Sequence, residues 1–280
     1  QVIDEAGNIG EISKEISTEA NSAGAYILAS ANRPTGQTTD WTGGTTYYYT
    51  GNPNNWVQFA GFWWRIIRIN GDGSIRMIYQ GTSANETGTG TQIGTSHFNN
   101  SYNNKTHVGL VYKTSNQHGY GTNSAILGKN NSTDTNTLNG WYNTHLKSYE
   151  EKYIDTGTGF CSDRNMASGY NWDSSKVYYA PVDRMNGGAS LQCYNEDILS
   201  KDSGKLQNPI GLVTSDEVVL TGITYNASNK GSYLYTGQNY WTMSPYGFRD
   251  YAMMLYMHDS GNLGWTPLNY SAGVRPVINL

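Results

Sequence analysis

A strand-turn-strand pattern over residues 62–79 is the feature that most restricts the fold of this sequence. Residues 62–69 and 75–79 are rich in Ile and aromatic side chains, which favour strands. Asn70 and Gly71 separate the two segments, and such a pair supplies the positive φ angles that a tight hairpin turn needs. The pattern predicts an antiparallel hairpin, and the apolar segment at 56–59 predicts an adjoining strand.

Three arginines, Arg65, Arg68 and Arg76, lie within these predicted strands. Charged side chains in a sheet commonly pair across it or extend their alkyl stems over apolar neighbours. We therefore expect structural roles for all three arginines and assign none of them to a ligand.

The N-terminal region differs from the rest of the chain. Residues 4–29 place Ile at near three-four spacing among Glu and Lys, which predicts an amphipathic helix. Residues 31–45 are rich in Thr, Gly and Pro and predict a connector. The sequence thus divides into a helix and connector over 1–45 and one main domain over 46–280.

Two more helices are expected in the main domain. Residues 136–149 carry an apolar stripe, with Asp134 or Asn136 as the expected N-cap. Thr214 and Glu217 have capping-box spacing, which predicts a short helix after a buried strand at 209–213. Short strands, two or three helices and long loops together predict an α+β fold with a small antiparallel core sheet.

Composition excludes some partners and indicates a compartment. The net charge is −4, and only 14% of residues are charged. There is no basic surface for nucleic acid, so that partner is not expected. The chain has 23 Tyr and 8 Trp, residues that serve exposed binding surfaces as well as cores. This composition is typical of a secreted or surface-displayed protein.

The sequence contains two cysteines, Cys161 and Cys193. Because the composition is typical of an extracellular protein, this single pair of cysteines predicts one disulfide. The alternative is two buried free thiols in a cytosolic protein.

No catalytic motif is recognisable. The chain lacks the zinc-protease, serine-hydrolase and phosphate-loop patterns, and its five histidines are scattered. Without repeated Cys or His spacing a zinc site is not supported. We expect no enzyme activity, no cofactor and no catalytic residue. The polar loops contain many oxygen ligands, so a structural calcium ion could bind there, but the sequence does not identify its position.

Several blocks of the sequence, in order, resemble a known family. They cover residues 55–59 with 62–79, 139–143 with 160–164, 208–218, 233–238, 240–245 and 273–280. Together they resemble C-type-lectin-fold variable surface proteins of Firmicutes-like gut bacteria, the kind that diversity-generating retroelements diversify. The resemblance implies a C-type-lectin-like fold whose core sheet contains the 62–79 hairpin and a closing strand at 273–280. It also implies that 246–272 is the variable, ligand-facing segment.

The expected core comes from the strand-like segments. The residues assigned to the core are the large apolar side chains of those segments. They are Trp63, Trp64, Ile66, Trp241, Met243, Val274, Val277 and Leu280.

The expected binding surface is drawn from the variable segment. Met253, Leu255 and Met257 alternate with Met254, Tyr256 and His258, so one set should face the core and the other solvent. We assign the second set to the surface. The predicted ligand-binding residues are Tyr246, Phe248, Arg249, Asp250, Tyr251, Met254, Tyr256, His258, Asp259, Asn262, Trp265, Thr266, Asn269 and Tyr270.

These expectations describe an extracellular, cell-surface-attached binding protein. Its partner would be a protein or glycan ligand on another cell, a phage or a host surface, and it would meet a membrane only through an anchor upstream of residue 1. Two alternatives remain: a structural or pilus-like surface component, and a glycan-binding lectin without diversification. A calcium-bridged sugar site is disfavoured, because Asn52-Pro53-Asn54 has no Trp-Asn-Asp partner. Formylglycine-generating activity is excluded by the lack of a late cysteine pair.

Overall fold

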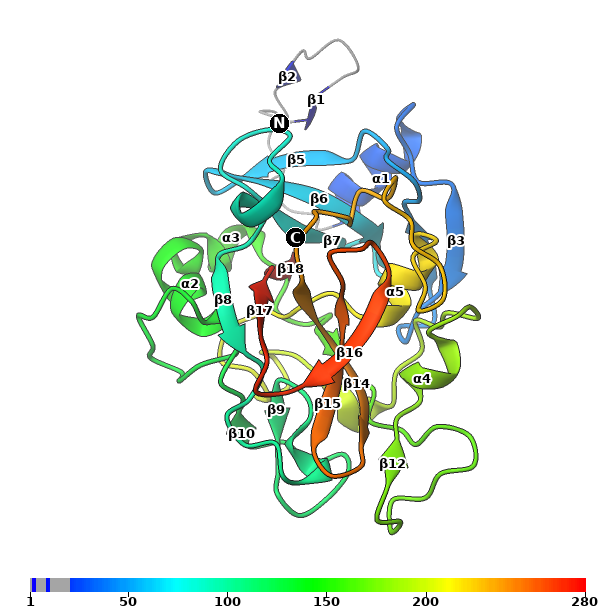
Figure 1. Ribbon diagram of the computed structural model, residues 1–280. Coiled ribbons are helices and arrows are strands. Elements are labelled where there is room, and N and C mark those ends of the chain that lie inside the picture. Colours follow the sequence, from blue (N-terminus) through cyan, green and yellow to red (C-terminus); the bar gives the residue numbers. More distant parts are fainter. Residues whose placement is uncertain (1, 4–8, 11–20) are drawn as a thin grey trace.

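The computed structural model describes residues 2–3, 9–10 and 21–280 (Figure 1). Within this part of the chain, two six-stranded sheets and a few short helices form a mixed α+β fold. Most strand pairs are antiparallel, and β14 with β17 is a parallel pair. In Figure 1 the blue and cyan strands of the first sheet lie above the orange and red strands of the second. The α+β class predicted from the sequence is confirmed.

The first sheet has the order β18-β7-β6-β4-β3, and β5 pairs with β6. Its strands are β3 (Gly36–Thr39), β4 (Thr45–Tyr48), β5 (Trp56–Phe59), β6 (Phe62–Ile69), β7 (Ile75–Gly81) and β18 (Val277–Asn279). The predicted hairpin is therefore confirmed as β6 and β7. The closing strand expected over 273–280 is split. Its second part, β18, pairs with β7 and joins this sheet as expected, whereas Gly273 and Val274 lie in a strand of the second sheet.

The hairpin turn differs from the prediction. The positive φ angle lies at Gly73, at 91°, and not at Asn70 or Gly71. Asn70 N donates to Ser74 O at 2.8 Å and Gly73 N donates to Asn70 O at 2.9 Å. The loop therefore has three residues, and its last residue takes the left-handed conformation that such loops require.

The second sheet has the order β16-β15-β14-β17-β8, and β12 pairs with β14. Its strands are β8 (Gly94–His97), β12 (Val177–Tyr178), β14 (Tyr240–Phe248), β15 (Ala252–Met257), β16 (Leu263–Pro267) and β17 (Ser271–Val274). Two tight turns connect β14, β15 and β16 into a meander, so β15 has a neighbour on each side.

The remaining elements are short. The small strand pairs are β1 (Val2–Ile3) with β2 (Ile9–Gly10), β9 (Val111–Tyr112) with β10 (Thr122–Asn123), and β11 (Phe160–Cys161) with β13 (Ile198–Leu199). The α-helices are α1 (Asn21–Ala29), α2 (Leu138–His145), α3 (Glu150–Tyr153), α4 (Pro181–Arg184) and α5 (Ser215–Leu220). The 3-10 turns are η1 (Gly88–Thr91), η2 (Lys105–His107), η3 (Lys147–Tyr149) and η4 (Asn195–Asp197). No helix in the described ranges is long and apolar enough to cross a membrane.

The N-terminal predictions need correction. Of the helix expected over 4–29, only α1 is observed, Ile9–Gly10 forms a strand, and most of the rest lies outside the described residues. The connector expected over 31–45 contains β3, which pairs with β4. Gly36 and the Thr residues of β3 have no apolar pattern, so only the pairing reveals the strand.

The two helices expected in the main domain are present. α5 has the predicted capping box, in which Thr214 and Glu217 each bond to the other's backbone N–H. α2 is capped by Thr137, whose side chain accepts from Gly140 N, and not by Asp134 or Asn136. The strand expected at 209–213 is reduced to an isolated bridge between Gly211 and Val277.

The predicted core is mostly buried. Trp64, Ile66, Trp241, Met243, Val274 and Val277 all lie in the main hydrophobic cluster. Trp63 and Leu280 are only half-buried. Trp63 follows the strand alternation away from Trp64 and packs edge-on against Trp56 at 6.1 Å.

The predicted disulfide is present. Cys161 and Cys193 are bonded, with their Cα atoms 5.8 Å apart. The bridge attaches the end of β11 to the chain that leads into η4 and β13.

Candidate functional site

The structure buries three residues that the sequence places on the binding surface, Met254, Tyr256 and Thr266. β15 is an inner strand, and both of its faces are covered. Met254 and Tyr256 belong to the main core cluster, whereas Met253 and Leu255 are buried outside it. Met257, which the prediction assigns to the core, also lies in the main cluster. All six residues of β15 are buried, so the prediction that Met254 and Tyr256 face solvent is wrong.

The other predicted residues do not form one surface. Phe248, Arg249, Asp250 and Tyr251 lie at the turn between β14 and β15, and His258, Asp259 and Asn262 lie at the turn between β15 and β16. The six residues of β15, at about 3.3 Å each, place these turns about 20 Å apart. Asn269 and Tyr270 are exposed, and Tyr270 lies near the second turn, because Asn239 contacts both Tyr270 and Asp259.

Tyr246 and Trp265 are two predicted residues that the structure does bring together. Their rings stack at 5.2 Å with an interplanar angle of 14°. Tyr246 is on β14 and Trp265 is on β16, so the pair spans β15. Leu255 lies directly opposite Trp265 in register and is fully buried. The stacked rings therefore cover the outer face of the sheet.

Two further tyrosines extend this pair into a row. Tyr178 contacts Tyr246 with ring centroids 5.3 Å apart, and Tyr170 contacts Tyr178 at 4.8 Å. Tyr170 and Trp265 are 42% and 37% exposed, while Tyr178 and Tyr246 between them are half-buried. We call Tyr170, Tyr178, Tyr246 and Trp265 the aromatic row.

The sequence did not reveal Tyr170 and Tyr178, because they join the row through the pairing of β12 with β14. Tyr178 lies opposite Gly247 in that pairing. A Cβ atom at Gly247 would lie 2.8 Å from Val177 O, which is too close for any other residue to fit without a shift of the chain. The glycine at position 247, within β14, was the local sign that another backbone segment lies close to it.

The loop that carries Tyr170 is fastened to the rest of the protein. The Lys105 ammonium lies 4.6 Å from the centre of the Trp172 ring and donates to the carbonyl oxygens of Trp172 and Ser174. The hydroxyl of buried Tyr179 donates to Lys105 O, and Tyr179 N donates to Tyr246 O at 3.1 Å. These contacts hold the loop and β12 in place beside β14.

The chemistry of the row is that of a contact surface. Burial raises the pKa of Tyr246, and its neighbours Tyr178 and Tyr225 raise it further, although Arg249 opposes them. The hydroxyl is thus neutral and can donate or accept a hydrogen bond. Rings with polar edges beside a guanidinium can stack on planar or ring-shaped groups and bond to their substituents.

The described residues contain no group of three or more His, Cys, Asp or Glu side chains arranged to hold a metal ion. The aromatic row includes no nucleophile paired with a base, and its ionisable members are tyrosines. Its geometry provides binding contacts.

Comparison with known proteins adds no further constraint. A scan against protein-family models, a search of curated proteins and a search of solved structures each found no match for this chain.

Proposed function

We propose that this chain is an extracellular ligand-binding protein, attached to a cell surface, that binds through the aromatic row and Arg249. The observation that carries the proposal is the continuous contact from Tyr170 to Trp265, which joins residues of β12, β14 and β16 and has both end rings exposed. The ligand is a protein or a glycan on another cell, a phage or a host surface.

The residue types in the row support this proposal. Tyr, Trp and Arg dominate binding energy at interfaces, where a single hot-spot residue contributes about 2 kcal/mol or more. Ring-to-ring contacts also fix the side chains before a ligand arrives, which lowers the entropy lost on binding.

We further propose that the scaffold is a C-type-lectin-like fold. Two features support it: β18 at the end of the chain pairs with the β6–β7 hairpin, and a second antiparallel sheet carries β14, β15 and β16. The disulfide fits an oxidising, extracellular compartment. The sequence blocks remain the argument for the variable-protein family itself.

A second candidate, a lectin with a fixed binding site, is favoured by one observation. All six residues of β15 are buried, although this strand lies within the segment 246–272 that diversification would change. Buried positions tolerate few substitutions. If the surface is diversified, the variable positions must be limited to the row and to the turns around it.

Loss of the two exposed rings tests the binding proposal. The double variant Tyr170→Ala/Trp265→Ala should lose about 4 kcal/mol of binding free energy, or about a thousandfold in affinity, if both are hot spots. The control is Tyr153→Ala/Tyr194→Ala, because these tyrosines are 41% and 47% exposed elsewhere on the protein. Binding of labelled protein to a glycan array and to bacterial and epithelial cells is measured. Equal binding by the two double variants would contradict the proposal.

Sister copies of the gene separate the two candidates. Diversification predicts substitutions at Tyr246, Arg249 and Trp265 over an unchanged β15. A fixed lectin predicts the same residues at those three positions in every copy, and sequencing the copies from one bacterial population decides between them.

A further inference from the structure

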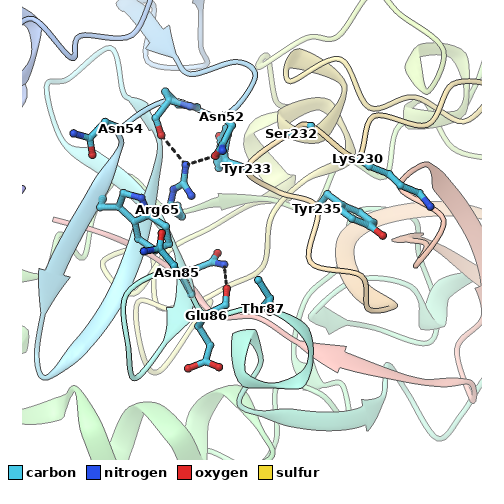
Figure 2. Close-up of a pocket in the computed structure, with 14 residues that line it drawn as sticks. Asn52, Asn54, Arg65, Asn85, Glu86, Thr87, Lys230, Ser232, Tyr233 and Tyr235 are labelled. Atoms are coloured by element: carbon cyan, nitrogen blue, oxygen red, sulfur yellow. Dashed lines mark hydrogen bonds between the residues drawn. The ribbon is translucent and has the colours of Figure 1, made fainter. Parts of the chain in front are cut away.

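A cavity of about 430 Å³ lies beside the first sheet, at the edge strand β5, and shares no lining residue with the aromatic row (Figure 2). Its volume is within the range of small-molecule sites. Figure 2 shows Arg65 and Asn85 on one side of the cavity and Tyr235 and Lys230 on the other. These residues come from segments far apart in the sequence, which the fold brings together.

Arg65 is the central group of this cavity. It is 4% exposed, and its guanidinium lies 4.1 Å from the centre of the Trp56 ring and 5.2 Å from that of Tyr233. Its Nε donates to Asn55, and its Nη2 donates to Asn52 Oδ1 at 3.2 Å and to Pro53 O at 2.8 Å. These bonds leave Nη1 with no acceptor in the described part of the chain.

Three of the other buried arginines have a carboxylate partner, and a fourth is bonded to neutral oxygen atoms through each of its nitrogens. Arg68, Arg76 and Arg164 each form an ion pair with a carboxylate. Arg275 has no such pair but donates through all three nitrogens to oxygen atoms of the protein. Arg65 has no carboxylate partner among the described residues. A buried charge without a counter-ion is costly, so the position of Arg65 in a cavity points to an anionic ligand.

Tyr233 contributes a ring surface to the cavity and not a hydroxyl. The side chain is 3% exposed and lines the cavity beside Arg65. Its hydroxyl is closed off from solvent and has no hydrogen-bond partner among the described residues, so a ligand could reach it only if the protein shifted. The contact with an anion in this cavity therefore falls to Arg65.

The rest of the lining is polar and contains few charges. Asn52, Gln80 and Asn85 contribute amides, which can both donate to and accept from hydroxyl groups. Glu86 contributes the one carboxylate and Lys230 a second cation, which gives the cavity a net charge of one positive unit. With Trp56 and Tyr235 as ring surfaces, the lining suits a polyhydroxylated ligand better than inorganic phosphate.

We propose that this cavity binds a sugar that carries a carboxylate, with the carboxylate held by Arg65 and the ring hydroxyls held by the amides. Burial lowers the pKa of Arg65 to about 10, so the guanidinium is charged at neutral pH. This site is separate from the aromatic row. A negative result at the cavity would therefore not affect the function proposed for that row.

Calorimetric titration of the full chain with D-glucuronate, D-glucose and inorganic phosphate tests the ligand class. Glucuronate should bind, and glucose should bind about tenfold more weakly or less, because it lacks the carboxylate. Equal binding of glucose would overturn the role of Arg65. Phosphate that binds as well as glucuronate would show a simple anion site and would overturn the sugar assignment, and no binding of glucuronate would overturn the proposal as a whole.

The variant Lys230→Ala tests the geometry without endangering the fold. It removes the second cation of the lining at an exposed residue, so the melting temperature should be unchanged, while the affinity for glucuronate should fall about threefold. Lys176→Ala is the matched control, since it removes the same exposed charge outside the cavity. Unchanged glucuronate affinity in Lys230→Ala would overturn the proposed charge match between the cavity and a carboxylate.

Discussion

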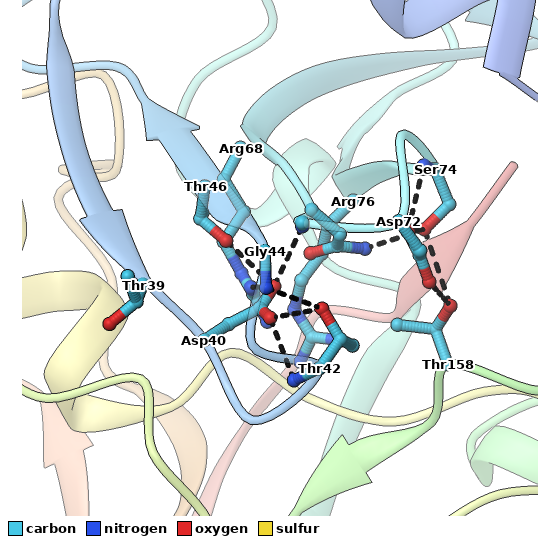
Figure 3. Close-up of polar contacts among 12 residues, drawn as sticks. Thr39, Asp40, Thr42, Gly44, Thr46, Arg68, Asp72, Ser74, Arg76 and Thr158 are labelled. Atoms are coloured by element: carbon cyan, nitrogen blue, oxygen red, sulfur yellow. Dashed lines mark hydrogen bonds and ion pairs between the residues drawn. The ribbon is translucent and has the colours of Figure 1, made fainter.

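At the scale of single residues, the first sheet depends on a buried group of charges. Arg68 Nη1 lies 3.3 Å from Asp40 Oδ2, and Arg68 and Arg76 both pair with Glu217. Figure 3 shows Asp40 among Thr42, Thr46 and Arg68. Burial alone would raise the pKa of Asp40, but hydrogen bonds from Gly71, Thr42 and Thr46 hold it below its usual value. The structural roles expected for Arg68 and Arg76 are confirmed.

The variant Glu217→Gln tests this group. It keeps the shape of the side chain but leaves two buried guanidiniums without their shared carboxylate, so the free energy of unfolding should fall by about 3–5 kcal/mol. Urea denaturation measures the change. Glu151→Gln, at an exposed position, is the control and should change the stability by about 0.5 kcal/mol or less. A similar small effect in Glu217→Gln would show that the cluster contributes little.

Two histidines predict how stability depends on pH. Burial lowers the pKa of both His107 and His145 in the folded protein, whereas an unfolded histidine titrates near about pH 6.5. Their contribution is therefore fully present above about pH 6.5 and is lost as the pH falls toward the lowered folded values. Urea denaturation between about pH 7.5 and 5.5 should show a decreasing free energy of unfolding.

The double variant His107→Gln/His145→Gln separates this effect from other titrating groups. Its free energy of unfolding should change less over the same pH range, even though the variant is less stable at every pH. A wild-type stability that stays level or rises as the pH falls would show that these histidines do not control the acid response.

At the scale of elements, the sequence correctly predicted the strands and helices that have a recognisable residue pattern within their own short stretch of chain. The hairpin of β6 and β7 has runs of apolar strand formers, and α5 has its capping box within four residues. β8 and β12 were missed because they are short and have no apolar alternation. They are strands because β17 pairs with β8 and β14 pairs with β12. A single sequence does not show which distant segment pairs with a strand. The same limit explains the wrong assignment of Met254 and Tyr256 on β15, since alternation does not show that both faces of a strand are covered.

The disulfide provides a prediction about the loop-rich middle of the chain. Cys161 and Cys193 are 32 residues apart, and a bridge that closes a loop of this length should stabilise the fold by about 3–4 kcal/mol in the chain-entropy model. Thermal unfolding with and without reductant measures this contribution. The double variant Cys161→Ser/Cys193→Ser is the control, because reductant should not change its melting temperature. A wild-type melting temperature that is also insensitive to complete reduction would contradict the prediction.

At the scale of the whole molecule, the two sheets carry different candidate sites. The aromatic row lies on β12, β14 and β16 of the second sheet and the loop that leads to β12, and the cavity around Arg65 lies beside the first sheet. The sequence placed Tyr246, Arg249 and Trp265 in the binding segment but gave no sign of Tyr170, Tyr178 or the cavity. Those depend on contacts between distant segments, which a pattern along the chain does not contain.

This division between scaffold and surface leads to a final prediction about stability. Trp241 is fully buried, packs against Phe98 at 5.4 Å and donates its indole N–H to Ser96 O. Trp241→Ala should lower the free energy of unfolding by about 3–5 kcal/mol. The double variant Tyr170→Ala/Trp265→Ala should lower it by about 1 kcal/mol or less, because substitutions of exposed residues usually have small effects. Urea denaturation compares the two variants. A loss in the double variant as large as that in Trp241→Ala would mean that the aromatic row is part of the scaffold, and the surface proposed for ligand binding would then have to be sought elsewhere.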